Sequence, residues 1–550
     1  MDIFSGLNPA QKKAVAHTEG PLLIMAGAGS GKTKVLTCRI ANLLAQGVAP
    51  YSILAITFTN KAATEMRERV DRMIGDAAKD VWLSTFHSFC ARFLRREIEA
   101  TGIYKRNFVI YDASDSQTVI KECLKEMNLD DKQFTPASVQ NAISNAKNQL
   151  MGPKAMERDA DNFHQKKIAE VYSLYAAKLR NNNALDFDDL LMISVVLLEE
   201  NEDIRTKYQG RFRYILVDEY QDTNGAQYQL TKILAARHHN LCVVGDADQS
   251  IYGWRGADIR NIMDFEQDYP EATVIKLEQN YRSTKNILAA ANAVIEHNVN
   301  RKPKELWTEN ATGEKLTSYQ AMDERDEAQF ITTTIMKQRT IFNASYGDIA
   351  ILYRTNAQSR IIEETFMRSG IPYTMVGGLK FYDRKEIKDI LAYLRVIYNP
   401  LDTVSLMRII NVPKRGLGAT TMAKLTAFAE EQELSLFDVI SNPEVLDAIP
   451  GITARVKKPL ELFTTFIFNF MNTHMNMKLD DLIDRVLKES GYIDELKADK
   501  KPEHESRVEN LKVGPSTDGS ADFGPLVTRA HLDKVKGYVD LGVKEGAKLV

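Results

Sequence analysis

The chain has 550 residues, of which 44% are hydrophobic, and a formal net charge of −3. This length allows several domains with real cores, and the balanced charge excludes nucleic-acid binding through overall charge, so any DNA contact must be a local groove. The four scattered cysteines, without a C-x-x-C pair, favour reduced thiols over a zinc site or a disulfide framework. There is no leader pattern and no apolar run near the ~20 residues that span a bilayer, so we expect a soluble, cytoplasmic protein without membrane contact.

The first part of the chain alternates strands and helices. Apolar runs at residues 22–25, 53–57, 81–85, 214–217 and 241–244 predict parallel strands, separated by amphipathic helices. Residues 108–189 are polar and helical, without a convincing strand, as an inserted subdomain would be. The pattern predicts an α/β domain in two parts, 1–107 and 190–273, with its sheet covered on both faces.

A second α/β unit is expected at residues 274–378. Its predicted strands are 274–277, 349–353 and 373–376, with helices at 284–297 and 358–368. Residues 379–512 are helical again. The composition then shifts at about residue 513, so residues 513–550 form a separate tail.

A glycine-rich loop follows the first strand and opens a helix, which is the order required of a P-loop. Backbone N–H groups and the helix N-terminus would hold phosphate, Lys32 would reach the β- and γ-phosphates, and Thr33 would ligate Mg²⁺. Ala26 replaces the first glycine of the usual pattern, so the match is loose at that edge, and a chance match is the alternative. The predicted nucleotide-binding residues are Ala26, Gly27, Ala28, Gly29, Ser30, Gly31, Lys32, Thr33 and Lys34.

Two adjacent carboxylates end the strand at residues 214–217. At the carboxyl end of a parallel strand they would lie in the ligand crevice beside the P-loop. Asp218 would then hold Mg²⁺, and Glu219 would orient and deprotonate the attacking water. The alternative is a solvated acidic turn.

The next strand leads to Gln249, which is placed to sense the γ-phosphate, and then to Tyr252, Trp254 and Arg255. These aromatic residues with an arginine are suited to base stacking, although burial in a core is the commoner place for such side chains. Further along the chain, Arg282 could neutralise charge on the transferred phosphoryl group and Tyr281 could stack on adenine; the alternative for Arg282 is a surface position at a helix start.

These motifs occur in a fixed order and closely resemble the UvrD/Rep-type superfamily 1 DNA helicases over residues 1–512. The resemblance rests on Gln11 and on the segments 26–33, 57–63, 85–88, 185–189, 217–222, 245–256, 279–284, 352–360 and 376–386. It implies an α/β fold of two RecA-like parallel-sheet P-loop domains, 1A and 2A, each with a helical insertion, 1B (108–189) and 2B (379–512). It also implies ATP and Mg²⁺ between the two RecA-like domains, with Gln11 at the adenine edge.

The same resemblance implies a path for one DNA strand over both RecA-like domains. Its partners would be single-stranded DNA, single-strand/double-strand junctions, and repair or replication proteins. It moves the favoured interpretation of Tyr252 and Trp254 from core to DNA contact. The implied DNA-binding residues are Phe58, Thr85, His87, Phe187, Tyr252, Trp254 and Arg255 in 1A, and Arg354 and Asn356 in 2A.

Residues 513–550 resemble instead a segment of the aldehyde dehydrogenases, especially the methylmalonate-semialdehyde dehydrogenases. They contain no dehydrogenase nucleophile or cofactor loop, so they predict no oxidoreductase. We expect a helicase truncated within 2B, with an incomplete 2A sheet, joined to an unrelated fragment. The predicted function is an ATP-dependent 3′→5′ DNA helicase with impaired hydrolysis and unwinding. The alternatives are an ATP- and DNA-binding fragment without motor activity, and another P-loop enzyme such as a small-molecule kinase.

Overall fold

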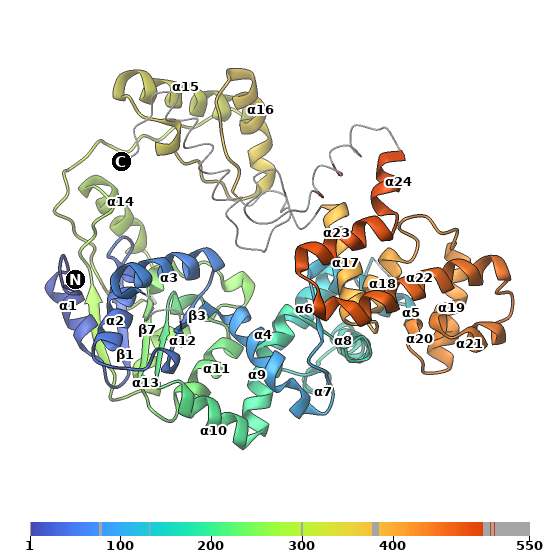
Figure 1. Ribbon diagram of the computed structural model, residues 1–550. Coiled ribbons are helices and arrows are strands. Elements are labelled where there is room, and N and C mark those ends of the chain that lie inside the picture. The colour runs from blue at the N-terminus through green and yellow to red at the C-terminus, as the bar shows by residue number, and fades with distance from the viewer. Residues whose placement is uncertain are drawn as a thin grey trace. The chain divides into compact units, whose positions relative to one another are not determined.

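The computed structural model describes residues 2–75, 80–130, 132–298, 301–376, 384–498, 507 and 511 (Figure 1). The chain divides into two compact units, and each is described by itself. The first comprises Met1–Gly313 and Ala392–Met477, and the second comprises Glu314–Leu391 and Lys478–Val550. The predicted tail at 513–550, and residues 377–383 of the last helicase-like motif, lie outside the described residues.

The first unit is built on a six-stranded sheet in which every pair of neighbouring strands is parallel. The strand order is β3-β2-β6-β7-β1-β8, which places β1 between β7 and β8 near one edge. The predicted parallel sheet is therefore confirmed. The strands are β1 (Leu22–Ala26), β2 (Ile53–Thr57), β3 (Trp82–Thr85), β6 (Tyr214–Val217), β7 (Leu241–Gly245) and β8 (Thr273–Leu277).

Strand β8 corrects one prediction. The sequence assigned it to the second α/β unit, but it pairs with β1, with Leu22 opposite Thr273 and Ala26 opposite Leu277. Ile275 and Leu277 are buried in the same core as the β1 side chains. An apolar strand pattern predicts a strand but does not identify its hydrogen-bonding neighbour, which is why the assignment was wrong.

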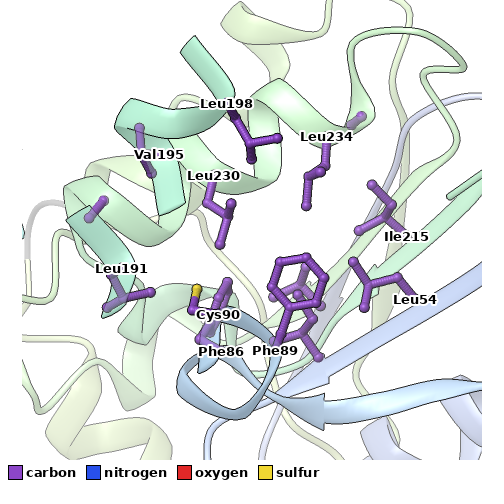
Figure 2. Close-up of a cluster of buried hydrophobic side chains, with 14 of the residues drawn as sticks. Leu54, Phe86, Phe89, Cys90, Leu191, Val195, Leu198, Ile215, Leu230 and Leu234 are labelled. Atoms are coloured by element: carbon purple, nitrogen blue, oxygen red, sulfur yellow. The ribbon is translucent and has the colours of Figure 1, made fainter. Parts of the chain in front are cut away.

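Apolar layers cover both faces of this sheet, because successive side chains of a strand point to opposite sides. In β1, Leu23 and Met25 join the core formed with α4 (Phe86–Glu97), α9 (Phe187–Glu200), α10 (Glu202–Arg211) and α11 (Gly225–Ala235). Figure 2 shows part of this core, with Phe86, Phe89 and Cys90 of α4 facing Leu230 and Leu234 of α11. Leu22, Ile24 and Ala26 face the other way, toward α1 (Pro9–Ala16), α2 (Lys32–Ala45) and α3 (Asn60–Ile74).

Residues 108–189 are mostly helical, as the sequence predicted, with one difference. Two short parallel strands, β4 (Val109–Tyr111) and β5 (Ala184–Asp186), pair at the two ends of this segment, where the sequence predicted none. Three-residue strands are too short to show a clear alternation of apolar and polar residues. The helices of the insertion are α5 (Ala113–Glu126), α6 (Pro136–Asn148), α7 (Pro153–Arg158) and α8 (Phe163–Asn181).

Helices from residues 392–477 pack against this insertion within the first unit. The Tyr111 hydroxyl donates to Asp402 Oδ1 at 2.6 Å, and Arg395 forms an ion pair of 2.7 Å with Asp115. These contacts join the two segments that the sequence assigned to 1B and 2B. The remaining helices of the first unit, with α17 continuing from the second, are α12 (Arg260–Met263), α13 (Phe265–Asp268), α14 (Lys285–Ile295), α17 (Lys385–Tyr398), α18 (Thr403–Ile409), α19 (Ala419–Glu431), α20 (Leu436–Ser441), α21 (Pro443–Ala448) and α22 (Ala454–Thr473).

Among the residues that the structure describes, the second unit contains helices and irregular segments but no strand. Helices α15 (Glu324–Phe342) and α16 (Ser359–Ser369) lie side by side around a small core that includes Ile335 and Phe366 (Figure 1). The strands predicted at 349–353 and 373–376 are not formed there, because no described neighbour supplies the backbone hydrogen bonds of a sheet. Instead Ile349 and Ile351 pack on the helix pair. Its other described helices are α23 (Leu479–Glu489), α24 (Tyr492–Ala498) and the start of α17.

None of the described helices is both long enough and apolar enough to cross a lipid bilayer.

Candidate nucleotide and DNA site

The glycine-rich loop connects β1 to α2, as predicted. Its last residue, Gly31, adopts the left-handed conformation with φ 86° and provides no side-chain cap for α2, which begins at Lys32. A helix whose first N–H groups are not capped by a side chain can bind an anion there, aided by the helix dipole. Ala26, the residue that departs from the usual glycine, is buried as the last residue of β1 and therefore does not disturb the loop.

Two glycines of the loop allow other segments to approach it closely. A Cβ at Gly29 would lie 2.6 Å from the Asn280 side chain, and one at Gly27 would overlap Leu306. Asn280 Nδ2 donates to the Ala28 carbonyl at 2.6 Å, and the Tyr281 N–H donates to the Gly29 carbonyl at 3.0 Å. The loop is therefore held from the side that carries Arg282. Sequence reasoning quoted Asn280 within a motif but missed this role, since a single asparagine gives no spacing signal.

A cleft of about 340 Å³ lies at the carboxyl end of the sheet, beside the loop. Five residues with predicted phosphate, metal or catalytic roles line it together: Lys32, Thr33, Glu219, Gln249 and Arg282. The rest of its lining is Ala28, Gly29, Gly31, Lys34, Glu65 and Arg69. Glu65 and Arg69 come from α3 and were missed, because an i, i+4 pair on an amphipathic helix looks like an ordinary solvated face.

Within the cleft, Lys32 Nζ forms an ion pair of 2.9 Å with Glu219 Oε2. The same carboxylate oxygen accepts a hydrogen bond of 2.9 Å from Gln221 Nε2. Glu219 has a positive φ of 47°, which is uncommon for a residue with a Cβ and is often found at functional sites. The lysine that would bind phosphate thus holds the carboxylate that would activate water.

Asp218 lies directly before Glu219 and is only 4% exposed. Its Oδ1 accepts the Glu219 N–H at 3.0 Å. Burial, and then the charge of Glu219, raise the pKa of Asp218 to about 6. A buried carboxylate whose charge is costly, together with the Thr33 hydroxyl, is an oxygen donor set that fits Mg²⁺, which prefers one or two carboxylates and retains other ligands from substrate and water.

A second ionic cluster is formed around Asp246 and Asp248, directly before Gln249 in the chain. Gln249 Nε2 donates to Asp246 Oδ2 at 2.5 Å, and Lys304, which is 3% exposed in its side chain, bridges Asp246 and Asp248. Arg301 adds an ion pair of 3.1 Å with Asp248. Sequence reasoning missed Lys304 and Arg301, because their partners are more than 50 residues away in the chain.

At the other end of the loop, Gln11 is 2% exposed and donates to the Ser30 carbonyl at 2.9 Å. Asn8 connects this corner to the Tyr281 segment, since its Nδ2 donates to the Tyr281 hydroxyl at 2.8 Å. The Tyr281 side chain remains 50% exposed. The residues predicted to contact adenine, Gln11 and Tyr281, are thus linked through Asn8, which was missed.

The predicted DNA-contacting aromatic residues are largely at the surface. Trp254 is 65% exposed and Phe187 is 50% exposed, so the core alternative for Trp254 is wrong. The Arg255 guanidinium lies 4.6 Å from the Trp254 ring centre and 5.4 Å from that of Tyr252, and the two rings lie 6.4 Å apart. His87 packs edge-to-face on Phe187 at 5.7 Å, and burial lowers the pKa of His87.

The remaining residues predicted to contact DNA are partly buried, cap a helix, or belong to the second unit. Phe58 is partly buried and packs edge-to-face on Phe86. Thr85 is 7% exposed, and its hydroxyl caps α4 by accepting the Ser88 N–H at 3.2 Å, so its contact with DNA stays a prediction. Arg354 and Asn356 are exposed in the second unit; Asn356 begins the short 3-10 helix η8 (Asn356–Gln358), which leads into α16, and Arg354 precedes it.

Comparison with known proteins agrees with this geometry. Residues 7–270 match the UvrD/REP helicase N-terminal domain, and residues 275–448 match the UvrD-like helicase C-terminal domain. The chain is 54% identical over 510 residues to the ATP-dependent DNA helicase PcrA of Staphylococcus epidermidis, and 53% identical to that of Staphylococcus aureus. Each alignment covers 92% of this chain and 69% of the relative.

Residues 485–550 match the aldehyde dehydrogenase family. This match confirms the predicted resemblance of the tail, and it begins earlier in the chain than the predicted residue 513. The matches to helicases cover most of the chain. The chain belongs to the UvrD/Rep helicase family.

Proposed function

We propose that this chain is an ATP-dependent DNA translocase and helicase that moves 3′→5′ along single-stranded DNA. The observation that carries the proposal is the Lys32–Glu219 ion pair of 2.9 Å, in the same cleft as Gln249 and Arg282. A lysine, a carboxylate, a glutamine and an arginine converging beside a P-loop are the groups that phosphoryl transfer from ATP to water needs.

The ion pair suggests how hydrolysis is coupled to binding. When Lys32 turns to the phosphates, Glu219 loses its cation and becomes a stronger acceptor for a water proton. Arg282 offsets charge on the phosphoryl group, and Gln249 is held near it by Asp246. Mg²⁺, when bound at Asp218 and Thr33, supplies charge neutralisation between the phosphates.

Coupling to DNA follows from the chain itself. Tyr252 and Trp254 come three and five residues after Gln249. Gln249 ends the short 3-10 helix η5 (Ala247–Gln249), Trp254 lies in the next one, η6 (Gly253–Arg255), and only residues 250–252 separate the two. A displacement of Gln249 on hydrolysis therefore reaches the exposed aromatic side chains through a short segment. Stacking on bases tolerates any sequence, as a translocase requires.

The test is an ATPase measurement with and without single-stranded DNA. We expect strong stimulation, and we expect Trp254→Ala to weaken single-strand binding by about 1–3 kcal/mol while leaving ATPase without DNA unchanged. Phe163→Ala is the matched control, since Phe163 is 69% exposed on the insertion. ATPase activity that single-stranded DNA does not stimulate would contradict the proposal and favour another P-loop enzyme, such as a small-molecule kinase.

One observation favours a second candidate, an ATP- and DNA-binding protein without motor activity. Among its described residues, the second unit contains helices but no strand, so it does not present the second parallel sheet that was predicted. Normal affinity for ATP and single-stranded DNA with negligible turnover would select this candidate. Strand separation would eliminate it, and with it the predicted impairment.

The proposal extends to the setting of the activity. We propose single-strand/double-strand junctions as the substrate, a cytoplasmic location, and repair or replication proteins as partners. Co-purification of such proteins on a junction substrate, and not on a blunt duplex, is the corresponding measurement.

A further inference from the structure

Four arginines gather around Trp82, away from the cleft. The guanidinium carbons of Arg92, Arg211 and Arg96 lie 4.1, 4.9 and 5.5 Å from the centre of the Trp82 rings. Arg67 joins them from α3, where its Nη2 donates to the Leu83 carbonyl at 2.7 Å. We name Arg67, Arg92, Arg96 and Arg211 the Trp82 arginine cluster.

The cluster carries positive charge without matching carboxylates. Over the described part of the chain, no ion pair connects any of these arginines to an acidic side chain. Glu97, on the same helix as Arg92, is already bonded to Lys207 at 2.7 Å and to Tyr208 at 2.9 Å. Arg92 and Arg96 are exposed, so their charges face solvent without a carboxylate partner, and a bound anion would relieve the repulsion among the four like charges.

Two further features of the cluster would be relieved by a bound anion. Arg211 Nε is buried and has no hydrogen-bond partner, although a guanidinium normally uses its donors. Burial lowers the pKa of Arg92, and the charges of Arg96, Arg211 and Arg67 lower it further. Arg96 is the member with a side-chain partner of its own, Tyr208.

The position of the cluster separates it from the predicted DNA path. Trp82 is the first residue of β3 and Thr85 the last, so Trp82 lies roughly 10 Å from the carboxyl end of the sheet. Helix α4 begins at Phe86 and runs back along the strand, which brings Arg92 and Arg96 to Trp82. Arg211 ends α10 on the same side. The cleft and the exposed aromatic residues follow strand ends, whereas this cluster lies at a strand start.

We propose that the Trp82 arginine cluster is a binding site for the phosphate backbone of duplex DNA. Arginine forks bind phosphate bidentately, and such contacts position a protein on DNA without reading its sequence. Trp82 is 4% exposed and offers no face to a base, unlike Trp254, so the site suits a duplex whose bases are stacked inside. The inference relies on the proposed function for its partner, DNA.

The test compares the salt dependence of binding to a blunt duplex and to a single strand. Each phosphate contact on duplex DNA contributes about 0.9 to the slope of log affinity against log salt. The double variant Arg92→Ala with Arg96→Ala should lower that slope by about 1.8 and weaken duplex binding by roughly tenfold or more. Its affinity for single-stranded DNA should not change.

Two controls keep the result specific. Arg485→Ala with Lys488→Ala removes the same charge from α23, where both side chains are exposed and paired with acidic residues, and should leave the slope unchanged. Arg92→Lys with Arg96→Lys keeps both charges and should keep most of the slope, while a purely structural role in covering Trp82 would not be restored by lysine. A urea unfolding curve for each variant verifies that it is folded.

The outcomes separate this inference from the proposed function. Three results would overturn the inference: an unchanged salt slope for duplex DNA in the double variant, an equal loss of affinity for duplex and single-stranded DNA, or a wild-type protein that does not bind duplex DNA. An unchanged salt slope is also the result expected if an acidic protein segment occupies the site. If single-stranded DNA still stimulates ATPase in that case, only the inference fails. If single-stranded DNA does not stimulate wild-type ATPase, the proposed function fails.

Discussion

In the first unit, six parallel strands each have hydrogen-bonded neighbours, whereas in the second unit the extended residues 349–353 lie against α15 and α16 without a strand beside them among the described residues. Ile349 and Ile351 face the helices, and Leu352 is 95% exposed. The first unit therefore buries both faces of its strands β1, β2, β6 and β7, whereas the second buries one face of its extended segment.

The difference explains where the chemistry is concentrated. A parallel sheet ends all its strands at one edge, so polar residues after β1, β6 and β7 converge there on one cleft. A pair of helices has no such common edge. Four substitutions test this contrast, beginning with the largest expected effect.

The first concerns the cleft of the first unit. Glu219→Gln keeps the size of the side chain but removes the base, so we expect kcat for ATP hydrolysis to fall roughly 10²–10⁴-fold with little change in KM. Steady-state ATPase with single-stranded DNA measures both constants. Glu200→Gln, at the exposed end of α9, is the control and should behave like wild type. A normal kcat for Glu219→Gln would remove Glu219 from the role of base.

The second concerns the buried ionic cluster of Lys304 with Asp246 and Asp248, next to Gln249. Lys304→Met would leave Asp246 buried without its cation, and breaking a buried pair in this way costs about 3–5 kcal/mol. The matched control is Lys302→Met, whose partner Glu266 is half exposed and whose loss should cost less than about 1 kcal/mol. Urea unfolding of both variants gives the comparison, and equal costs would show that Lys304 does not hold this cluster.

The third uses pH. Because the folded pKa of Asp218 is raised to about 6 from 3.8, the folded state holds a proton that the unfolded state has lost between these values. Stability from this group is present below pH ~4 and is lost as pH rises through about 6, by about 3 kcal/mol in all. Asp218→Asn should therefore lose less stability than wild type between pH 5 and 7.5 in buffer without Mg²⁺.

Unfolding midpoints in urea at the two pH values measure this difference, and Asp203→Asn, on an exposed site of α10, should follow wild type. Added Mg²⁺ should stabilise wild type at pH 7.5 and not Asp218→Asn. The same pH dependence in Asp218→Asn and wild type would contradict the assignment.

The fourth concerns the second unit and has the smallest expected effect. Leu352→Ser should change the free energy of unfolding by no more than about 0.5 kcal/mol, because Leu352 is at the surface. Ile335→Ala, in the core of α15 and α16, should cost about 2–5 kcal/mol. A large cost at Leu352 would show that a second sheet covers it, as the sequence predicted.

The sequence by itself determined the local elements and the chemistry of single motifs. The strand-loop-helix around Lys32 and the carboxylates Asp218 and Glu219 were predicted from residues close together in the chain, whereas local sequence alone favoured a core position for Trp254, which is 65% exposed. Such predictions succeed because hydrophobic period, glycine conformation and helix starts depend on neighbours in sequence.

Only the tertiary structure decided which distant segments meet. It placed β8 beside β1, left residues 349–353 without a strand neighbour among the described residues, and brought Lys304 to Asp246, Asn280 to the P-loop carbonyls and four arginines to Trp82. The physical reason is that strand pairing and buried ion pairs depend on partners far along the chain, and a local pattern of residues does not specify those partners.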